Sequence, residues 1–346
     1  MATVADKRGF ALPAVLVVVG VVTLVFLVAI TSLAGLADQT RQVLGEVRFE
    51  QAALDAEAGA SFLAATQPLT STALMTGSGA SAPASGGFGD SSRQAADRIE
   101  LDGRPYATPG PPRLLVSLQD EAGLVNLDVM GRNGAPGLFA ALGVPPEQRA
   151  AMTDRLADYT DADDLKHAQG AEAADYVRAG VAPPPNALLR SATQLFGLLG
   201  WRQTVSPEAW AATRDQVTAD PTSVSVNVNT ASPTALKVLY GLTDPQVRAV
   251  VAQRAKAPLV NLEDFGRAAG VAMTGDIERV YTFPNGRFAL KIVDPAAGLV
   301  ARSRIVLTPQ DAERPVWIED RNVAILSKPE RATTPANVPP LPRPAA

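Results

Sequence analysis

The sequence contains no cysteine and only one histidine, His167, among its 346 residues. Without cysteine the chain can form neither disulfides nor a thiolate nucleophile, and one histidine cannot build a histidine-based zinc site. The net charge is −4 and the pI about 5.2, which argues against a general nucleic-acid binder. The length is sufficient for two or three domains with a core of their own.

Charge is absent from Phe10 to Ala37. A helix rises ~1.5 Å per residue, so this run exceeds the ~20 residues that span a bilayer, and we predict a single-pass transmembrane helix over residues 10–37. Because Lys7 and Arg8 precede it, the positive-inside rule predicts a cytoplasmic N-terminus. In a bacterium the C-terminal domain would then lie in the periplasm. The alternative is an ordinary signal peptide cleaved after Ala37, although its apolar core would be unusually long.

The helix is predicted to continue to residue 66, because residues 38–65 lack proline and are rich in good helix formers. Pro68 ends it, and the Ser/Gly-rich residues 67–97 are expected to form a flexible loop. Apolar residues at helical spacing predict one buried stripe, formed by Leu36, Val43, Val47, Leu54, Ala58 and Phe62.

The remaining chain alternates between strand and helix signals. A hairpin is predicted over residues 114–127. Proline, caps and glycine stops predict helices within 145–159, 191–199, 233–240, 241–254 and 261–270. Strands are expected at 288–293, 301–307 and 316–318, whereas the Pro-rich tail, 327–346, has no periodicity and is expected to be disordered.

One cluster of acidic residues could carry chemistry: Asp158, Asp161, Asp163, Asp164 and Glu172. Carboxylates at these spacings, with Gly170 among them, could converge on a hard cation such as calcium. They do not follow the EF-hand pattern. The residues alone leave open a solvated helix end and, less favoured, a pair of catalytic carboxylates.

The segment Val226–Pro233, followed by two short helices, resembles a helix-hairpin-helix unit over residues 222–273. Such units can grip nucleic-acid phosphates through a glycine-containing hairpin. Here the hairpin carries Asp244, and the unit holds only five basic residues against three acidic ones. A packing module is therefore favoured over a nucleic-acid site, and no nucleic-acid partner is expected.

The N-terminus resembles that of type IV pilins and pseudopilins, with Lys7-Arg8-Gly9-Phe10 leading into the apolar helix. The resemblance implies that residues 1–9 are a prepilin leader, that prepilin peptidase cleaves between Gly9 and Phe10, and that Phe10 is then N-methylated. Most members carry Glu five residues into the mature chain, where this sequence has Ala14. A buried carboxylate in lipid persists only with a partner, so its loss suits a subunit at the end of a filament.

The order of the motifs along the chain resembles the K-type minor pseudopilin of type II secretion (general secretion pathway protein K). These motifs are the leader, Ala14, the Asp158–Asp164 segment, Gly170-Ala171-Glu172 and the Val226–Pro233 signature. The resemblance implies an α+β, pilin-like fold with a small antiparallel sheet. The α/β domain would comprise residues 67–128 and 282–326, interrupted by an all-α insertion over 129–281.

The same resemblance implies a non-catalytic subunit at the tip of the pseudopilus, anchored in the bacterial inner membrane. Its expected partners are the I- and J-type minor pseudopilins, prepilin peptidase and secreted cargo. It also implies structural Ca²⁺ at the acidic cluster, although Ala173 replaces an acidic residue that is usual there. The alternatives are a minor pilin of a type IV pilus or DNA-uptake machine, and a membrane-anchored hydrolase.

Overall fold

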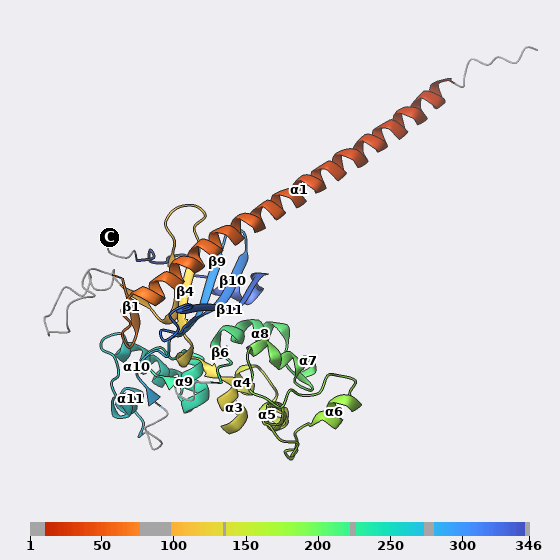
Figure 1. Cartoon of the computed structure of the whole chain (residues 1–346). Coiled ribbons are helices and arrows are strands. Elements are labelled where there is room, and N and C mark those ends of the chain that lie inside the picture. The colour runs from red at the N-terminus through yellow and green to blue at the C-terminus, as the bar shows by residue number, and fades with distance from the viewer. Residues whose placement is uncertain (1–10, 77–97, 134–135, 222–225, 273–279, 343–346) are drawn as a thin grey trace, which may run out of the picture. The chain divides into compact units, whose positions relative to one another are not determined.

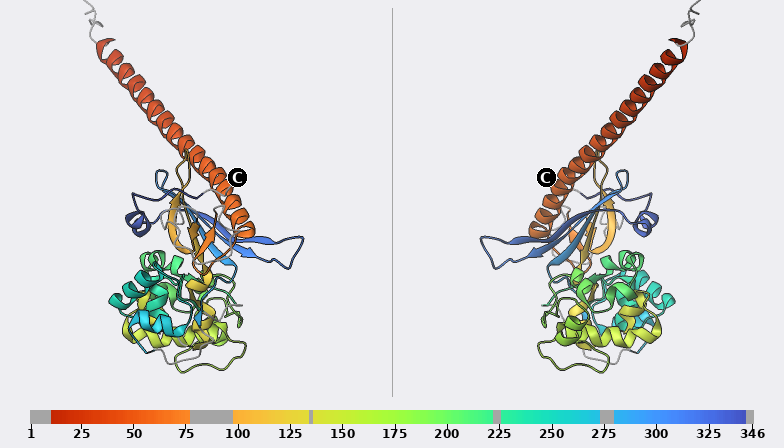
Figure 2. Two further views of the ribbon diagram at one scale, coloured as in Figure 1. Left: turned by 90° about the vertical axis from the view of Figure 1, so that its left-hand side faces the viewer. Right: turned by 90° about the vertical axis from the view of Figure 1, so that its right-hand side faces the viewer.

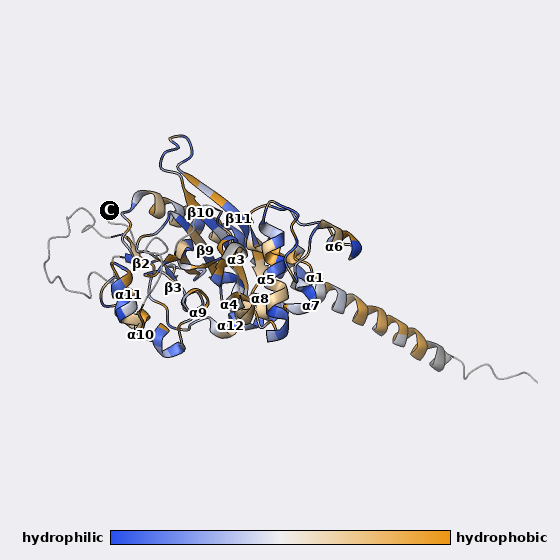
Figure 3. Ribbon diagram, turned by 90° about the horizontal axis from the view of Figure 1, so that it is seen from below, coloured by the Kyte–Doolittle hydropathy of each residue, from blue (hydrophilic) through white to orange (hydrophobic). Residues whose placement is uncertain are grey.

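The computed structural model describes residues 11–76, 98–133, 136–221, 226–272 and 280–342, which form two units, Met1–Gln51 and Ala52–Ala346. Helix α1 spans Ala11–Thr66, in agreement with the predicted helix (Figure 1). Within it, Val15–Leu33 has a mean hydropathy of 2.9 and is long enough to cross a membrane. Figure 3 shows this apolar stretch along the helix. The hydroxyls of Thr23 and Thr31 donate hydrogen bonds to backbone carbonyls one turn earlier in the helix, so neither hydroxyl leaves an unpaired donor.

A five-stranded antiparallel sheet forms the centre of the second unit, in the order β11-β10-β9-β4-β3. Its strands come from the two chain segments on either side of the insertion. They are β3 (Asp102–Ala107), β4 (Leu115–Asp120), β9 (Arg287–Asp294), β10 (Leu299–Leu307) and β11 (Val316–Ile325). The predicted strands at 288–293, 301–307 and 316–318 are confirmed, and β11 is longer than expected.

The last turns of α1 cover one face of this sheet. Ala60 and Leu63 of the helix line an apolar cavity of about 280 Å³ together with Val116 and Leu118 of β4 and Leu341 of the tail. The predicted buried stripe is wrong here, because Leu54 and Phe62 are 45% and 60% exposed. The helix instead buries small residues, Ala53, Ala60 and Ala64, together with Leu63. Small side chains let the helix backbone lie close to the sheet, which apolar spacing alone does not reveal.

The predicted hairpin at 114–127 is also wrong. The chain does not turn back to pair with β4. Instead, a buried 3-10 turn, η2 (Glu121–Gly123), leads it into β5 (Val125–Asn126). β5 pairs in parallel with β6 (Val217–Thr218), and β4 pairs with β3 and β9. The carboxylate of Asp120 fixes the turn by accepting a hydrogen bond from the Ala122 N–H. Two further short strands, β1 (Ala73–Met75) and β2 (Arg98–Glu100), pair with each other, and β1 lies in the predicted loop. Residues 77–97 of that loop lie outside the described residues.

The helical insertion has its own hydrophobic core, with buried residues from Val125 to Ala269 (Figures 1 and 2). Helices predicted from proline and cap signals are present, although the one after Ser191 is a 3-10 helix. The elements are α3 (Leu127–Asn133), α4 (Pro136–Ala141), α5 (Pro146–Thr160), α6 (Ala173–Arg178), η3 (Ala192–Gly197), α7 (Trp201–Thr204), α8 (Pro207–Thr213), η4 (Arg214–Gln216), β7 (Val226–Asn227), α9 (Pro233–Tyr240), α10 (Asp244–Arg254), α11 (Leu262–Ala269) and β8 (Val280–Tyr281).

The Pro-rich tail is ordered as far as Pro342, so the prediction of disorder over 327–346 is wrong for 327–342; the last four residues lie outside the described ones. Helix α12 (Lys328–Thr333) is capped by Ser327, and its Glu330 forms an ion pair with Arg302 of β10. Farther along, Ala107 of β3 donates to the Pro339 carbonyl and accepts from the Leu341 N–H, both at 2.8 Å. Contacts with distant parts of the chain order this segment, and these contacts cannot be inferred from its amino-acid composition.

Candidate metal site

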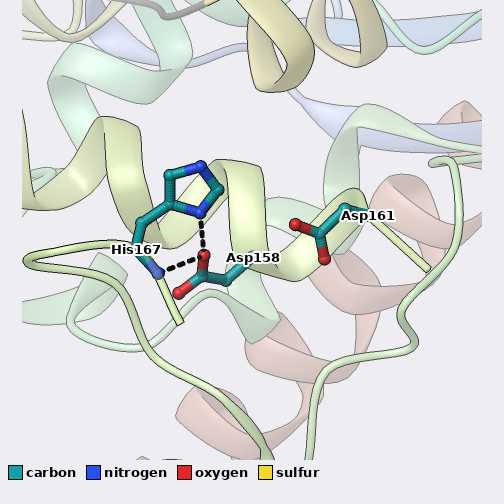
Figure 4. A group of neighbouring side chains, drawn as sticks. All are labelled: Asp158, Asp161 and His167. Atoms are coloured by element: carbon teal, nitrogen blue, oxygen red, sulfur yellow. Dashed lines mark hydrogen bonds and ion pairs between the residues drawn. The ribbon is translucent and has the colours of Figure 1, made fainter. Parts of the chain in front are cut away.

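The predicted acidic cluster lies where α5 ends and the chain continues toward α6. Figure 4 shows two of its members, Asp158 and Asp161, together with His167. Pro146 suits the first turn of α5, and the helix buries Met152 and Leu156 against the insertion core. Asp158 lies in its last turn and is completely buried, whereas Asp161 directly follows the helix. Burial of a carboxylate at this position is costly unless a partner compensates it.

Asp158 has only one of its two oxygens satisfied. Its Oδ1 accepts a hydrogen bond from the His167 backbone N–H at 3.1 Å and contacts Nδ1 of the same residue. This contact raises the pKa of His167. Ligand atoms of Asp158, Asp161 and His167 lie within 4.8 Å of one another. Figure 4 shows how the His167 ring and the carboxylates of Asp158 and Asp161 lie near one another.

Several buried oxygens of the cluster have no hydrogen-bond partner among the described residues. They are Oδ2 of Asp158, Oδ1 of Asp161, both side-chain oxygens of Glu172 and Oδ1 of Asn186. Buried polar groups in native proteins are almost always hydrogen-bonded or bound to an ion. The cluster therefore contains oxygen acceptors that no side chain or backbone group of the described residues satisfies.

Mutual repulsion appears in the pKa values of the cluster. Burial raises the pKa of Glu172, and the negative charges of Asp158 and Asp161 raise it further. The pKa of Asp161 is raised by burial and then by Asp163 and Asp158. Like charges this close favour protonation or a bound cation.

Gly170 allows the backbone of the loop to approach the buried carboxylate. A Cβ atom at this position would lie 1.8 Å from Oδ2 of Asp158, so a side chain cannot be added without displacing one of them. The glycine thus holds the loop against the orphan oxygen, a role that its place in the sequence only suggested.

Asp163 and Asp164 contribute less directly. Asp163 accepts from the Leu165 N–H at 2.8 Å, and Asp164 accepts from the Asn186 amide at 3.2 Å. Asn186 was not predicted as a site residue. It has a positive φ of 44° and also donates to the Asp163 carbonyl, while its own Oδ1 is buried without a partner among the described residues. An asparagine after three prolines, a residue that tolerates this conformation, was the available signal.

The donor set fits calcium. Calcium binds roughly six to eight hard oxygen ligands, supplied by carboxylates, amide or backbone carbonyls and water. The five orphan oxygens named above are of this kind, and waters or carbonyls of the loop could complete the shell. The single imidazole and the absence of sulfur ligands disfavour zinc.

The Val226–Pro233 signature serves packing. Asn227 and Thr230 donate to Oδ2 of Asp120 at 2.9 and 2.7 Å. Asn229 exchanges hydrogen bonds with the backbone of Leu259, ahead of α11. Arg254 of α10 donates to the Ala231 carbonyl at 2.6 Å. The polar groups of this unit are therefore directed into the protein, as expected for a packing module.

The leader residues Gly9 and Phe10 lie outside the described residues. Comparison with known proteins gives two family matches, both described as type II secretion system (T2SS), protein K; they cover residues 115–222 and 226–281. No curated protein matches the sequence. The crystal structure of the GspK-GspI-GspJ complex from the enterotoxigenic Escherichia coli type 2 secretion system contains a similar chain, with 17% identity and a TM-score of 0.47. The similarity covers 64% of this chain and 83% of that one.

The described chain combines an apolar N-terminal helix, an antiparallel sheet and a helical insertion, and the family matches assign this α+β chain to the minor pseudopilins. The two family matches, which include the whole metal-site loop and the Val226–Pro233 signature, specify it further. The chain belongs to the type II secretion system protein K family.

Proposed function

We propose that this minor pseudopilin is the tip subunit of the type II secretion pseudopilus, where it helps to initiate assembly and export across the outer membrane without catalysing a reaction. The observation that carries this proposal is the match of both protein K models to the insertion. Ala14, in the place of the usual glutamate, supports a terminal position because no subunit above needs that contact. The bulk of the insertion would also obstruct a further subunit.

The proposed partners are I- and J-type minor pseudopilins, with secreted cargo as a further contact. Membership of the protein K family supports these partners, because minor pseudopilins act as subunits of one pseudopilus. The apolar segment Val15–Leu33 supports single-pass anchoring. In this proposal the anchor lies in the inner membrane and the sheet and insertion lie in the periplasm.

Deletion and complementation test the proposal. A clean deletion is expected to abolish secretion of type II substrates while leaving their synthesis and enzymatic activity intact. Co-purification of the full chain from membranes should recover the I- and J-type subunits. Normal secretion in the deletion strain would refute the proposal, as would salt-sensitive DNA binding with unchanged secretion, the result expected of a DNA-uptake pilin.

Processing is proposed to occur between Gly9 and Phe10 by prepilin peptidase, followed by methylation of Phe10. Mass spectrometry of protein extracted from membranes reports the mature N-terminus directly. A methylated Phe10 is expected. A start at Asp38 would instead identify an ordinary signal peptide, and an intact leader would identify an unprocessed anchor.

We further propose that Asp158, Asp161 and Glu172 hold a structural Ca²⁺, with Asn186 as an additional oxygen donor and Asp163 and Asp164 adding negative charge. The unpartnered buried oxygens support this assignment. The ion would join the end of α5 to the start of α6 and fix the loop between them. It supplies charge neutralisation and takes no part in a reaction.

A further inference from the structure

The two edges of the five-stranded sheet are treated differently. At the β3 edge, the tail covers the backbone through its two hydrogen bonds to Ala107. At the opposite edge, β11 ends the strand order, and no strand within the described ranges pairs with its outer side. Figure 2 shows the β10–β11 hairpin extending sideways. Open edges of this length normally pair with another strand or are blunted.

The backbone groups that face outward can be assigned from the ladder. Thr308 donates to the Pro315 carbonyl, and Leu326 donates to the Gly298 carbonyl, each at 2.8 Å. Antiparallel pairs alternate between bonded and non-bonded positions, and a register shift after Glu319 resets this alternation. The N–H and C=O groups that point away from β10 therefore belong to Val316, Ile318, Val323 and Ile325.

These four residues also share one face of the sheet. They lie opposite Leu307, Ile305, Ala301 and Leu299, which alternate on β10 and so lie on the same side. Across the sheet, Ala301 lies opposite Ile292, and Ile292 lies opposite Val116, which lines the cavity beneath α1. This face is therefore the one that α1 covers. On this α1 side, Ile318, Val323 and Ile325 remain 39%, 42% and 67% exposed.

The other face of β11 is polar and acidic. Glu319 and Asp320 are 43% and 44% exposed at the side chain, while Arg304, which pairs with both, and Arg287, which pairs with Glu319, are only 9% and 18% exposed. Trp317 lies on the Glu319 side and is covered by Arg314 at 5.1 Å. The edge thus offers unpaired backbone groups, apolar side chains on one face and carboxylates on the other.

We propose that the β11 edge binds an extended, basic segment of another protein as an added strand. Main-chain hydrogen bonds would supply affinity, and alternation of the side chains would supply specificity. The segment would place β-branched apolar residues on the α1 side and Lys or Arg opposite Glu319 and Asp320. A second copy of this chain fits poorly, because it would set the same carboxylates against each other. This inference is independent of the tip assignment and of the metal site.

A blocked ten-residue peptide of alternating valine and lysine provides the probe. The full chain in neutral-lipid nanodiscs is expected to bind it, and a peptide of the same sequence with alternate backbone nitrogens methylated should bind at least tenfold more weakly. Val323→Pro removes one outward N–H and should weaken binding by a similar factor. Ile318→Lys, which keeps the backbone intact, should weaken it as well.

Val260→Lys provides a matched control, because Val260 is an exposed valine in the insertion and its replacement should leave binding unchanged. Equal binding of the methylated and unmethylated peptides would overturn the proposal, since the contact would then be electrostatic only. Equal binding by folded Ile318→Lys would also overturn it. Concentration-dependent dimerisation that Ile318→Lys abolishes would identify a second copy as the occupant and refute the basic segment.

Discussion

Two buried aspartates of this protein have opposite surroundings. Asp120, at the end of β4, is completely buried, and both its oxygens accept hydrogen bonds, from Asn227, Thr230 and the Ala122 N–H. Asp158, at the end of α5, is also completely buried, but its Oδ2 has no partner in the described parts of the chain, and it lies beside other carboxylates. The protein satisfies the first carboxylate with its own donors, whereas the second belongs to the group of carboxylates for which we propose a bound cation.

This difference is the reason for treating Asp120 as a structural carboxylate and Asp158 as part of the proposed calcium site. Burial raises the pKa of Asp120 to about 6, with neutral donors lowering it in part. These donors come from the Val226–Pro233 signature, so Asp120 joins the sheet to the insertion. In the other cluster, Asp158 contacts His167, but several carboxylates also lie close to one another and raise the pKa of Glu172 and Asp161. A divalent cation would remove that repulsion, whereas it would have no free oxygen at Asp120.

The largest effect is expected from Asp120→Ala. Removal of the acceptor leaves Asn227 and Thr230 with only long contacts of 3.4 Å, to the carbonyls of Ser71 and Asn227. A buried donor without a good partner costs about 1 to 3 kcal/mol, so the free energy of unfolding should fall by about 3 kcal/mol. Urea unfolding of the full chain in detergent, followed by tryptophan fluorescence, measures this. Glu263→Ala, on an exposed helix surface, is the control and should change stability by less than about 0.5 kcal/mol. A loss below about 1 kcal/mol for Asp120→Ala would show that the joint is not held by this network.

Calcium should produce the next largest effect. Binding to the folded state alone stabilises by about 2.7 kcal/mol at 100 times the Kd. The melting temperature of the full chain should therefore rise on addition of CaCl₂ and fall again with EGTA. Magnesium, which demands stricter octahedral geometry, should act more weakly. An unchanged melting temperature at millimolar calcium would contradict a structural calcium site.

Glu172→Gln should separate the two roles of charge at this site. The variant is expected to lose most of the calcium response, because the two carboxylate oxygens are replaced by one neutral amide oxygen and an NH2 group that cannot bind calcium. Without calcium it should be as stable as the parent chain or slightly more so, since like-charge repulsion is relieved. Glu147→Gln, in the exposed first turn of α5, should retain the full response. A retained response in Glu172→Gln would remove Glu172 from the ligand set.

Acidification should give the smallest effect. The pKa of Glu172 is raised in the folded state, so its contribution to stability is present below its ordinary value of 4.5 and is lost as pH rises through the raised value. Without calcium, the difference in melting temperature between the parent chain and Glu172→Gln should be largest near neutral pH and should shrink as the carboxylate is protonated. A difference independent of pH would mean that Glu172 carries no charge repulsion.

Local signals predicted most helices of the insertion. Ser232 and Asn261 cap α9 and α11 through their side chains, and Gly270 ends α11 with a positive φ of 67°, each as residue type and spacing indicate. The acidic cluster was also visible as a run of carboxylates. Its grouping could be expected, whereas the orphan oxygens and the role of Asn186 depend on how the loop folds back.

The predictions from sequence were wrong where contacts between distant segments of the chain determine the structure. Residues 124–127 looked like the second strand of a hairpin, but Val125 pairs with Val217, far along the chain. Phe62 fitted an apolar stripe, but the sheet packs against the side of α1 that carries Ala60 and Ala64. The tail had no periodicity, yet Arg302 and Ala107 order it.

The sequence by itself determined the apolar helix, the positions of most caps and strands, and the presence of an acidic loop, because each depends on residues close together in the chain. Only the tertiary structure decided which face of α1 is buried, which edge of the sheet stays open, and which carboxylates lack donors. Those outcomes depend on long-range packing, which places Asp120 against Thr230 and Asp158 beside Gly170. Burial and hydrogen bonding follow from that arrangement, and they distinguish the structural carboxylate of Asp120 from the proposed site at Asp158.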